Sequence, residues 1–223
     1  MSDIRTEIVE YLKGNYLYNS RKFLKEKLNL IVICGYAGSG KTTISNYLKS
    51  KYNLTVIHLD DLTQIAKFNS LKEIKEKDKI IFEFFINHTK LYKHLKSITY
   101  NYVYDKLYSE FMSFVLSRKY TEEIVVIEGV KTIQPFLEQD EPEYFNKVLN
   151  IQLIKDTSLF VITRTSKLVS SIRGAFRNVK LYGKNKNKII EWFYQFKRLI
   201  CYKDLSFKID KFKQFLKDGE END

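Results

Sequence analysis

Residues 28–42 read LNLIVICGYAGSGKT, and this stretch decides the fold of the chain. Its first half, residues 28–34, is a short and continuous apolar run, which is typical of a strand buried on both faces of a parallel sheet. The glycine-rich half interrupts that strand, and helical apolar spacing then resumes over residues 41–51. The stretch therefore predicts a strand, a tight loop and a helix in direct succession.

The loop at residues 35–42 fits the pattern G-x-x-x-x-G-K-[ST]. Glycines let the backbone curl so that several N–H groups point at one anion, and the following helix adds its positive N-terminal end. Lys41 can reach the β and γ phosphates of a nucleotide, and the Thr42 hydroxyl can ligate Mg²⁺. We therefore predict a binding site for ATP and Mg²⁺ that is formed by Gly35, Tyr36, Ala37, Gly38, Ser39, Gly40, Lys41, Thr42 and Thr43.

Three further apolar runs have the same buried character, at residues 54–59, 124–127 and 159–163. Helical periodicity is seen over residues 3–27, from 164 to about 177, over 188–202 and over 211–217, with a short strand or turn at 205–209. Strands that alternate with helices predict an α/β fold, a three-layer parallel sheet with helices on both faces. With 44% hydrophobic residues in 223, the chain fits one domain over residues 1–223.

Each predicted strand ends in a candidate functional residue, and these residues are Gly35, Asp60, Glu128 and Arg164. Ligands of parallel α/β sheets bind at the carboxyl ends of the strands, so we expect these residues to gather at one edge. An acid directly after four buried apolar residues is costly unless it pairs or binds a cation, which makes Glu128 a candidate metal ligand.

The histidines show no metal-site spacing. His58 lies on a predicted strand just before an acid pair, and core packing is the favoured interpretation. His88 and His94 are predicted to lie at the surface.

Beyond the loop, the sequences VIHLDDL (56–62) and VVIEGV (125–130) resemble the P-loop small-molecule kinases of the uridine kinase and nicotinamide riboside kinase branch. The resemblance implies that Asp60 is the base for the acceptor hydroxyl, with Asp61 as second choice. It also implies that Glu128 and Thr42 organise the Mg²⁺.

Basic residues crowd residues 157–190, which contain eight Lys or Arg and no acid. The resemblance implies a lid here, over residues 164–188, whose arginines neutralise the transferring phosphoryl group. Arg173 and Arg177 lie four apart and share a helix face, so we assign them this role, with Gly174 as a hinge. A solvated basic face or a nucleic-acid surface is the other interpretation.

Residues 63–120 carry helical periodicity and many aromatic residues, and they predict a helical insert in the place where such kinases bind the acceptor. Aromatic rings suit a nucleobase by stacking, although at helical spacing they more often belong to a core. The aromatic residues of the insert that we singled out are Phe82, Phe84, Phe85, Tyr92, Tyr100, Tyr102, Tyr104 and Tyr108.

The sequence thus predicts ATP- and Mg²⁺-dependent phosphoryl transfer to the hydroxyl of a small molecule, a nucleoside or a nucleoside-like compound. Two alternatives remain open. The net charge of +11 would also suit a polynucleotide 5′-hydroxyl kinase, and a non-metabolic NTP-dependent switch would keep the same loop. The acceptor, the preferred triphosphate and the oligomeric state stay open.

The N-terminal residues are charged throughout, and no apolar stretch approaches the length of a membrane span. Two cysteines do not form a disulfide framework, and Cys34 is predicted to be a small core residue. These features predict a cytoplasmic protein that has no membrane contact.

Overall fold

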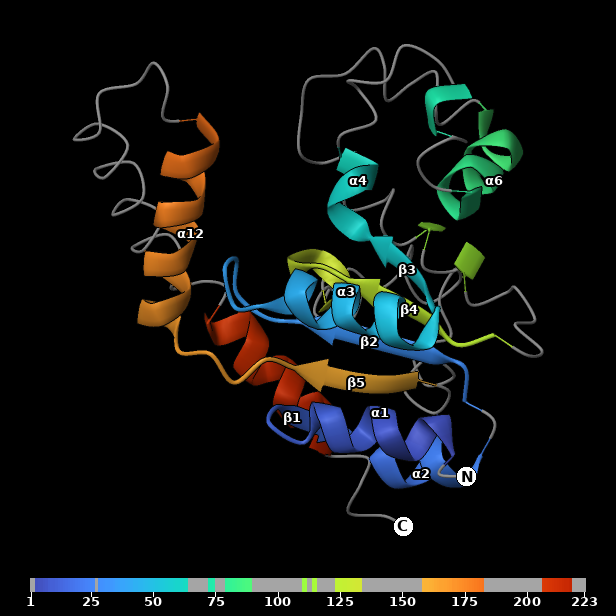
Figure 1. Cartoon of the computed structure of the whole chain (residues 1–223), viewed down its shortest axis with the longest axis horizontal. Helices are drawn as coiled ribbons and strands as arrows, with labels where there is room; N and C mark the ends of the chain where they lie inside the picture. The colour runs from blue at the N-terminus through green and yellow to red at the C-terminus, as the bar shows by residue number, and fades with distance from the viewer. Residues whose placement is uncertain are drawn as a thin grey trace.

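The computed structural model of the chain describes residues 3–26, 28–63, 72–74, 79–89, 110–111, 114–115, 123–133, 158–182 and 206–217. In this part of the chain, five strands form one sheet in the order β1-β5-β2-β4-β3 (Figure 1). The strands are β1 (Tyr16–Tyr18), β2 (Leu30–Cys34), β3 (Thr55–His58), β4 (Val125–Glu128) and β5 (Ser158–Ile162).

The sheet is parallel except at one edge. β2 lies at its centre and pairs in parallel with β4 and β5, and β3 pairs in parallel with β4. β1 pairs antiparallel with β5. The predicted α/β fold is confirmed, but the sheet is mostly parallel rather than parallel throughout, and the prediction of helix over residues 3–27 was wrong at β1. A three-residue strand is too short to show a period of two, and only its pairing with β5 makes it a strand.

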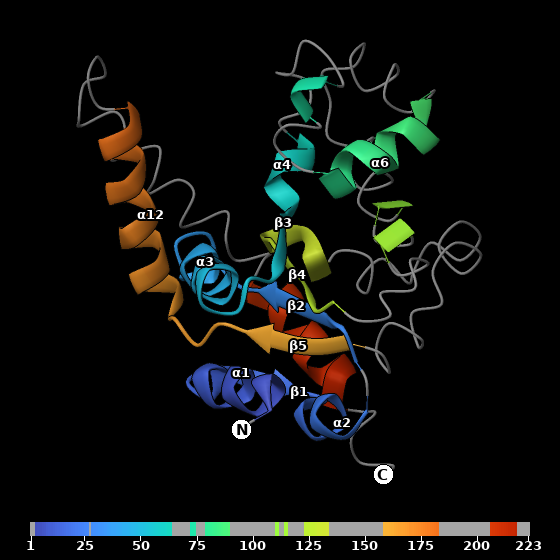
Figure 2. The ribbon, with the colours of Figure 1, turned by 45° about the vertical axis from the view of Figure 1, so that its right-hand side comes forward.

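Helices cover both faces of this sheet (Figure 2). The helices that the structure describes include α1 (Ile4–Leu12), α2 (Ser20–Lys25), α3 (Lys41–Tyr52), α4 (Leu59–Thr63), α6 (Lys79–Asn87) and α12 (Lys167–Tyr182), with a 3₁₀ turn at Val130–Ile133. Residues 206–217 are also helical. The strand or turn predicted at 205–209 was therefore wrong at residues 206–209, and residue 205 lies outside the described residues. Ile209, Phe212 and Leu216 are buried at helical spacing, so they form one apolar face of this helix. Within this face, the ring of Phe212 packs against Phe160 of the sheet at 5.6 Å between centroids.

The core has two halves, one on each face of the sheet. On one face, Ile31, Ile33 and neighbouring strand residues pack against α1, α2 and α3. On the other face, Val32 and Cys34 belong to a cluster that includes residues of α6 and of the C-terminal helix 206–217. The predicted three layers are present, and Cys34 is the buried core residue that the sequence predicts.

The predicted insert at residues 63–120 is described only in part. Its described residues include α6 and contain no strand. Phe84 and Phe85 are fully buried, which agrees with the expectation that aromatic residues at helical spacing belong to a core. The five tyrosines singled out above, His94 and the helix predicted at 188–202 lie outside the described residues. Nowhere in the described part of the chain is a helix both long and apolar enough to span a bilayer.

His88 differs from its prediction as a surface residue. It is half-buried, its ring stacks on Phe84 at 4.4 Å between centroids, and Nδ1 lies 2.8 Å from the Phe84 carbonyl oxygen.

The parallel arrangement brings the carboxyl ends of β2, β3, β4 and β5 to one edge. After leaving β2, the chain runs to β3 and β4 on one side and then to β5 on the other. α12 follows β5 and α4 follows β3, and both rise from this edge (Figures 1 and 2). A ligand site at the end of β2 is therefore flanked by two different parts of the fold.

Candidate phosphate-binding site

The loop at residues 35–40 joins β2 directly to α3, as its pattern requires. Gly38 and Gly40 have φ angles of +83° and +95°, which glycine adopts without strain. A Cβ on Gly38 would lie 2.3 Å from the Ser170 carbonyl oxygen of α12, and a Cβ on Gly35 would lie 1.9 Å from Thr163 Oγ1. These glycines are therefore needed for the curl of the loop and for the close approach of its neighbours.

Two threonines after β5 hold the loop in place. Thr163 Oγ1 donates a hydrogen bond of 2.7 Å to Ser39 Oγ, and Thr165 Oγ1 donates one of 2.8 Å to the Ser39 carbonyl oxygen. Sequence reasoning missed both threonines and favoured Arg164 between them. Arg164 is exposed, and its guanidinium lies 4.6 Å from the ring centre of Tyr16 on the edge strand β1. The sequence did hold a signal for these threonines. In an extended chain, alternate side chains point the same way, so Thr163 and Thr165 face the loop while Arg164 between them points away.

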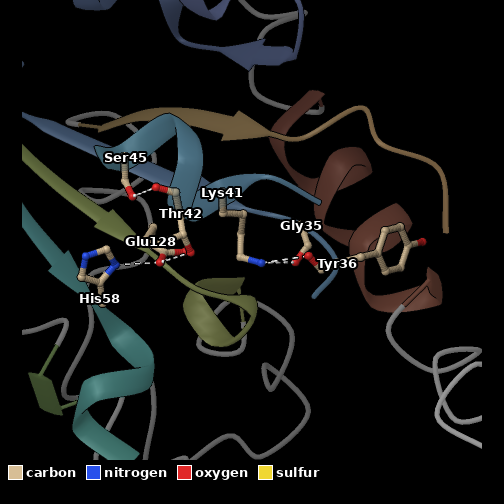
Figure 3. A network of polar contacts seen from close by, with 7 residues as sticks. All are labelled: Gly35, Tyr36, Lys41, Thr42, Ser45, His58 and Glu128. Carbon is tan, nitrogen blue, oxygen red and sulfur yellow. Dashed lines mark hydrogen bonds and ion pairs between the residues drawn. The ribbon is translucent and has the colours of Figure 1, made fainter. Parts of the chain in front are cut away.

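Lys41 begins α3 and lies under the loop, with only 7% of its surface exposed. Its Nζ donates hydrogen bonds to the carbonyl oxygens of Gly35 at 3.2 Å and Tyr36 at 2.9 Å (Figure 3). The ammonium group is thus held at the carboxyl end of β2 by the loop itself. Tyr36 extends to the other side, where its hydroxyl lies 3.1 Å from Ser206 Oγ of the C-terminal helix.

Three polar side chains meet beside the loop (Figure 3). Thr42 Oγ1 donates a hydrogen bond of 2.9 Å to Glu128 Oε1, and His58 Nδ1 lies 2.7 Å from the same oxygen. The predicted pair Thr42 and Glu128 is therefore in contact, and only 6% of Glu128 is exposed. Thr42 itself is exposed in the first turn of α3, as is Thr43.

His58 was predicted to be a core residue, and this was wrong. It is the last residue of β3 and the register partner of Glu128 in β4, so the two side chains meet at the edge of the sheet. About 29% of the His58 side chain is exposed. The signal in the sequence was the similar ending of two buried runs, TVIH and VVIE, each closed by a polar residue.

The contacts set the charge of this pair. Burial by itself would raise the pKa of Glu128, but the hydrogen bond to His58, the charge of Lys41 and the Thr42 hydroxyl bring the pKa below its ordinary value. The hydrogen bond to Glu128 raises the pKa of His58, with smaller contributions from the charges of Glu128 and Asp61, while burial opposes them. Glu128 is therefore a carboxylate at neutral pH.

The two aspartates lie beyond β3 rather than at its end. The strand closes at His58, and Asp60 and Asp61 stand in the first turn of α4. Asp60 is exposed and Asp61 is half-buried. Carboxylates in a first helical turn are favoured by the helix dipole, which offers a structural role beside the predicted catalytic one.

α12 carries the predicted lid arginines, and the helix predicted to about residue 177 continues to Tyr182. Arg173 is exposed and makes no hydrogen bond or ion pair with another described residue, while the side chain of Arg177 lies outside the described part. Gly174, predicted as a hinge, lies inside the continuous helix. It is buried against the loop, where Gly38 approaches its backbone.

The donor set suits a cation that is delivered with a ligand. Among the described residues, no group of three or more His, Cys, Asp or Glu could hold a metal ion. Mg²⁺ needs fewer protein groups, since it is commonly bound by one or two protein oxygens together with phosphates and water. The Thr42 hydroxyl donates its proton to Glu128, which turns its lone pairs away from the carboxylate and leaves them for a cation.

The fold and the site together define an α/β protein whose central strand leads into a glycine-rich loop, the candidate phosphate-binding loop, with a hydroxyl–carboxylate pair beside it. No family model matches the chain. Shikimate kinases from two strains of Staphylococcus epidermidis are each 36% identical to it over 44 residues, which is 20% of this chain and 26% of each relative. The chain thus spans about a quarter of the length of the curated relatives it matches.

One solved structure, a shikimate kinase from Bacteroides thetaiotaomicron, aligns with 86% of this chain and 98% of its own, at 16% identity and a TM-score of 0.41. At that TM-score the two backbones agree only loosely. The resemblance to the uridine kinase and nicotinamide riboside kinase branch stays a prediction.

Proposed function

We propose that this protein is a P-loop kinase that transfers the γ-phosphoryl group of ATP, with Mg²⁺, to a hydroxyl of a small molecule. The observation that carries the proposal is the contact between Thr42 and Glu128 beside the glycine loop. A phosphate loop alone indicates nucleotide binding. A buried carboxylate that orients the loop's own hydroxyl adds the group that a magnesium nucleotide requires.

Each residue of the site has a distinct role in this proposal. Backbone amides of residues 35–42 and the N-terminal end of α3 hold the phosphates. Lys41 exchanges its bonds to two loop carbonyls for bonds to phosphate oxygens. When bound, Mg²⁺ would neutralise charge on the transferring group, held by Thr42 and by Glu128.

The acceptor hydroxyl needs a proton acceptor, and we assign this role to Asp60, with Asp61 as the alternative. Both stand at the start of α4, which rises from the same edge of the sheet as the loop (Figure 1). Exposure of Asp60 leaves it accessible to a substrate. Arg173 and Arg177 on α12 would reach the transferring phosphoryl group from the other side of the edge.

A direct test is product detection by mass spectrometry. The protein is incubated with ATP, Mg²⁺ and a panel of nucleosides, shikimate, nucleotides and a 5′-hydroxyl oligonucleotide. Shikimate is included because the curated relatives are named for it. We expect one small-molecule acceptor to gain 80 mass units, about the mass of an added PO₃H group. Phosphorylation of the oligonucleotide alone, or binding of ATP without any acceptor, would overturn the proposal in favour of one of the two alternatives.

The base assignment is tested on the same product. Asp60→Asn should reduce turnover by about 10² to 10⁴, the range of general acid–base contributions, while ATP binding is retained. Equal product from wild type and Asp60→Asn would reject Asp60. The same result paired with a large loss in Asp61→Asn would transfer the role to Asp61.

A further inference from the structure

His58 makes a contact that the proposed chemistry does not require from it. Its Nδ1 lies 2.7 Å from Glu128 Oε1, and the two residues are register partners on neighbouring parallel strands. An ionised carboxylate can only accept hydrogen bonds, so Nδ1 carries the proton and donates it. The contact therefore selects the tautomer of His58 as well as the orientation of Glu128.

The two hydrogen bonds of the Glu128 carboxylate converge on one oxygen. Oε1 accepts from Thr42 on the loop side and from His58 on the β3 side, and Figure 3 shows Glu128 lying between them. Among the described residues no hydrogen bond goes to Oε2. The two donors approach this oxygen from different elements, Thr42 from α3 and His58 from β3, and together they restrict the orientation of the carboxylate and hence the direction of Oε2.

A glutamate at a strand end would otherwise turn about its side-chain bonds. Thr42 alone does not prevent this, because its hydroxyl rotates to suit its acceptor. The imidazole ring is rigid, and β3 fixes its place through the pairing of β3 with β4. A Cβ on Gly129 would lie 2.8 Å from Leu59 Cβ, so the absence of a side chain there lets the residues after β3 and β4 approach closely.

We propose that His58 is a positioning residue of the magnesium–nucleotide site: its Nδ1–H holds the Glu128 carboxylate so that Oε1 orients Thr42, and Glu128 would then be oriented to hold the divalent cation. The proposal rests on the proposed function, since it deepens the role of Glu128 at the same site. In this proposal His58 acts through Glu128, and we assign it no contact with the nucleotide or the cation. Partners that orient metal ligands commonly contribute 10- to 100-fold in metal affinity, so the effect is measurable.

The test separates metal affinity from nucleotide binding. ATP affinity is measured by calorimetry in EDTA, and the Mg²⁺ concentration for half-saturation is then measured by titrating Mg²⁺ into the protein–ATP mixture. His58→Phe and His58→Leu remove the donor, whereas His58→Asn places an amide nitrogen near the position of Nδ1. We expect the first two to raise the half-saturating Mg²⁺ concentration about 10-fold or more, and Asn to restore it to within about threefold.

His88 supplies the matched control. It is also a half-buried histidine whose Nδ1 contacts an oxygen, in this case the backbone carbonyl of Phe84. His88→Asn should leave the Mg²⁺ titration unchanged. Melting temperatures of all variants show that each is folded, and the exposed fraction of His58 at the strand end favours tolerance of Phe, Leu and Asn.

The outcomes distinguish failure of the positioning role of His58 from failure of the proposed function. If neither His58→Phe nor His58→Leu changes the Mg²⁺ titration, the positioning role is wrong. It is also wrong if Asn behaves like Phe and Leu, or if all three lose ATP binding in EDTA, because His58 then serves only the fold. If wild type binds ATP with no response to Mg²⁺, or binds no ATP, the proposed function itself fails.

Discussion

The two sides of the candidate phosphate-binding loop, residues 35–42, differ in their polar contacts. On the side of β3 and β4, polar groups are joined in the folded chain, with Glu128 bonded to both Thr42 and His58 within 2.9 Å. On the side of α12, Arg173 is exposed and makes no hydrogen bond or ion pair with another described residue. The same helix exposes an apolar stripe at i, i+4 and i+8, formed by Leu168, Ile172 and Phe176.

This difference separates polar groups that are already fixed in the folded chain from an arginine that is exposed and for which we propose a role with a bound ligand. Dipoles and charges that are fixed before binding cost no reorganisation during a reaction, and the Glu128 side of the loop has this character. On the side of α12, the backbone of Ser170 and Gly174 lies against Gly38, while the Arg173 side chain is exposed. Substitutions on the two sides should therefore differ in whether they alter ground-state binding or only turnover.

The largest effect is expected at Lys41. Lys41→Met removes the buried ammonium that both loop carbonyls now hold. We expect a loss of about 10³-fold in turnover, since removal of one preorganised charge-stabilising donor costs about 10² to 10³. Calorimetry with ATP and initial rates would check this. Normal turnover in the folded variant would show that the loop is not the phosphate site.

A glycine pair tests the contact between the loop and α12. Gly38→Ala would force a Cβ to 2.3 Å from the Ser170 carbonyl oxygen at a φ of +83°, and we expect a loss of about 3 kcal/mol in the free energy of unfolding. Gly174→Ala is the control. Its Cβ would lie 3.7 Å from the Ala37 carbonyl oxygen, an ordinary contact, and alanine is favoured inside a helix by about 1 kcal/mol.

Urea unfolding of both glycine variants gives the comparison directly. Equal free energies of unfolding for the two variants would mean that α12 does not contact Gly38 closely in solution. A destabilised Gly174→Ala with an unaffected Gly38→Ala would reverse the assignment of which glycine the contact needs.

Arg173 tests the other side of the comparison. Because its side chain is exposed, Arg173→Ala should change the free energy of unfolding by less than about 0.5 kcal/mol. ATP affinity should also stay near that of wild type, while turnover falls by about 10²-fold. Steady-state kinetics separate kcat from KM. A large loss of ATP affinity would place Arg173 among the ground-state contacts, with Lys41.

The smallest effect concerns pH and the His58–Glu128 pair. The folded pKa of His58 is raised above its unfolded value of 6.5, so its contribution to stability is complete below about pH 6.5 and is lost as pH rises through the folded pKa. The folded pKa of Glu128 is lowered from 4.5, so its contribution is present above about pH 4.5 and is lost as pH falls through the folded pKa. The pair is therefore most stabilising between these two values.

We expect the stability difference between wild type and His58→Asn to be greatest near pH 5.5 and to shrink toward pH 8.5. Urea unfolding of both proteins across this range measures it. A difference that grows with pH would contradict the direction of the His58 shift.

Much of the frame was predictable because its signals are local. Continuous apolar runs indicated β2, β3, β4 and β5 to within a few residues, since a strand buried on both faces needs apolar side chains at every position. The strand β1 and the start of the C-terminal helix were missed. β1 exists through its pairing with β5, and the C-terminal helix is recognised by the burial of Phe212 against Phe160.

The sequence by itself determined the glycine-rich loop, its flanking strand and helix, and the acid at residue 128, because each is encoded by a short pattern of neighbouring residues. Only the tertiary structure decided that His58 meets Glu128 and that Thr163 supports Ser39. These pairs are separated by 70 and 124 residues, and strand order and register alone bring them together. A local sequence pattern can indicate a functional side chain, but the residue that forms a hydrogen bond with it and orients it comes from a distant part of the chain.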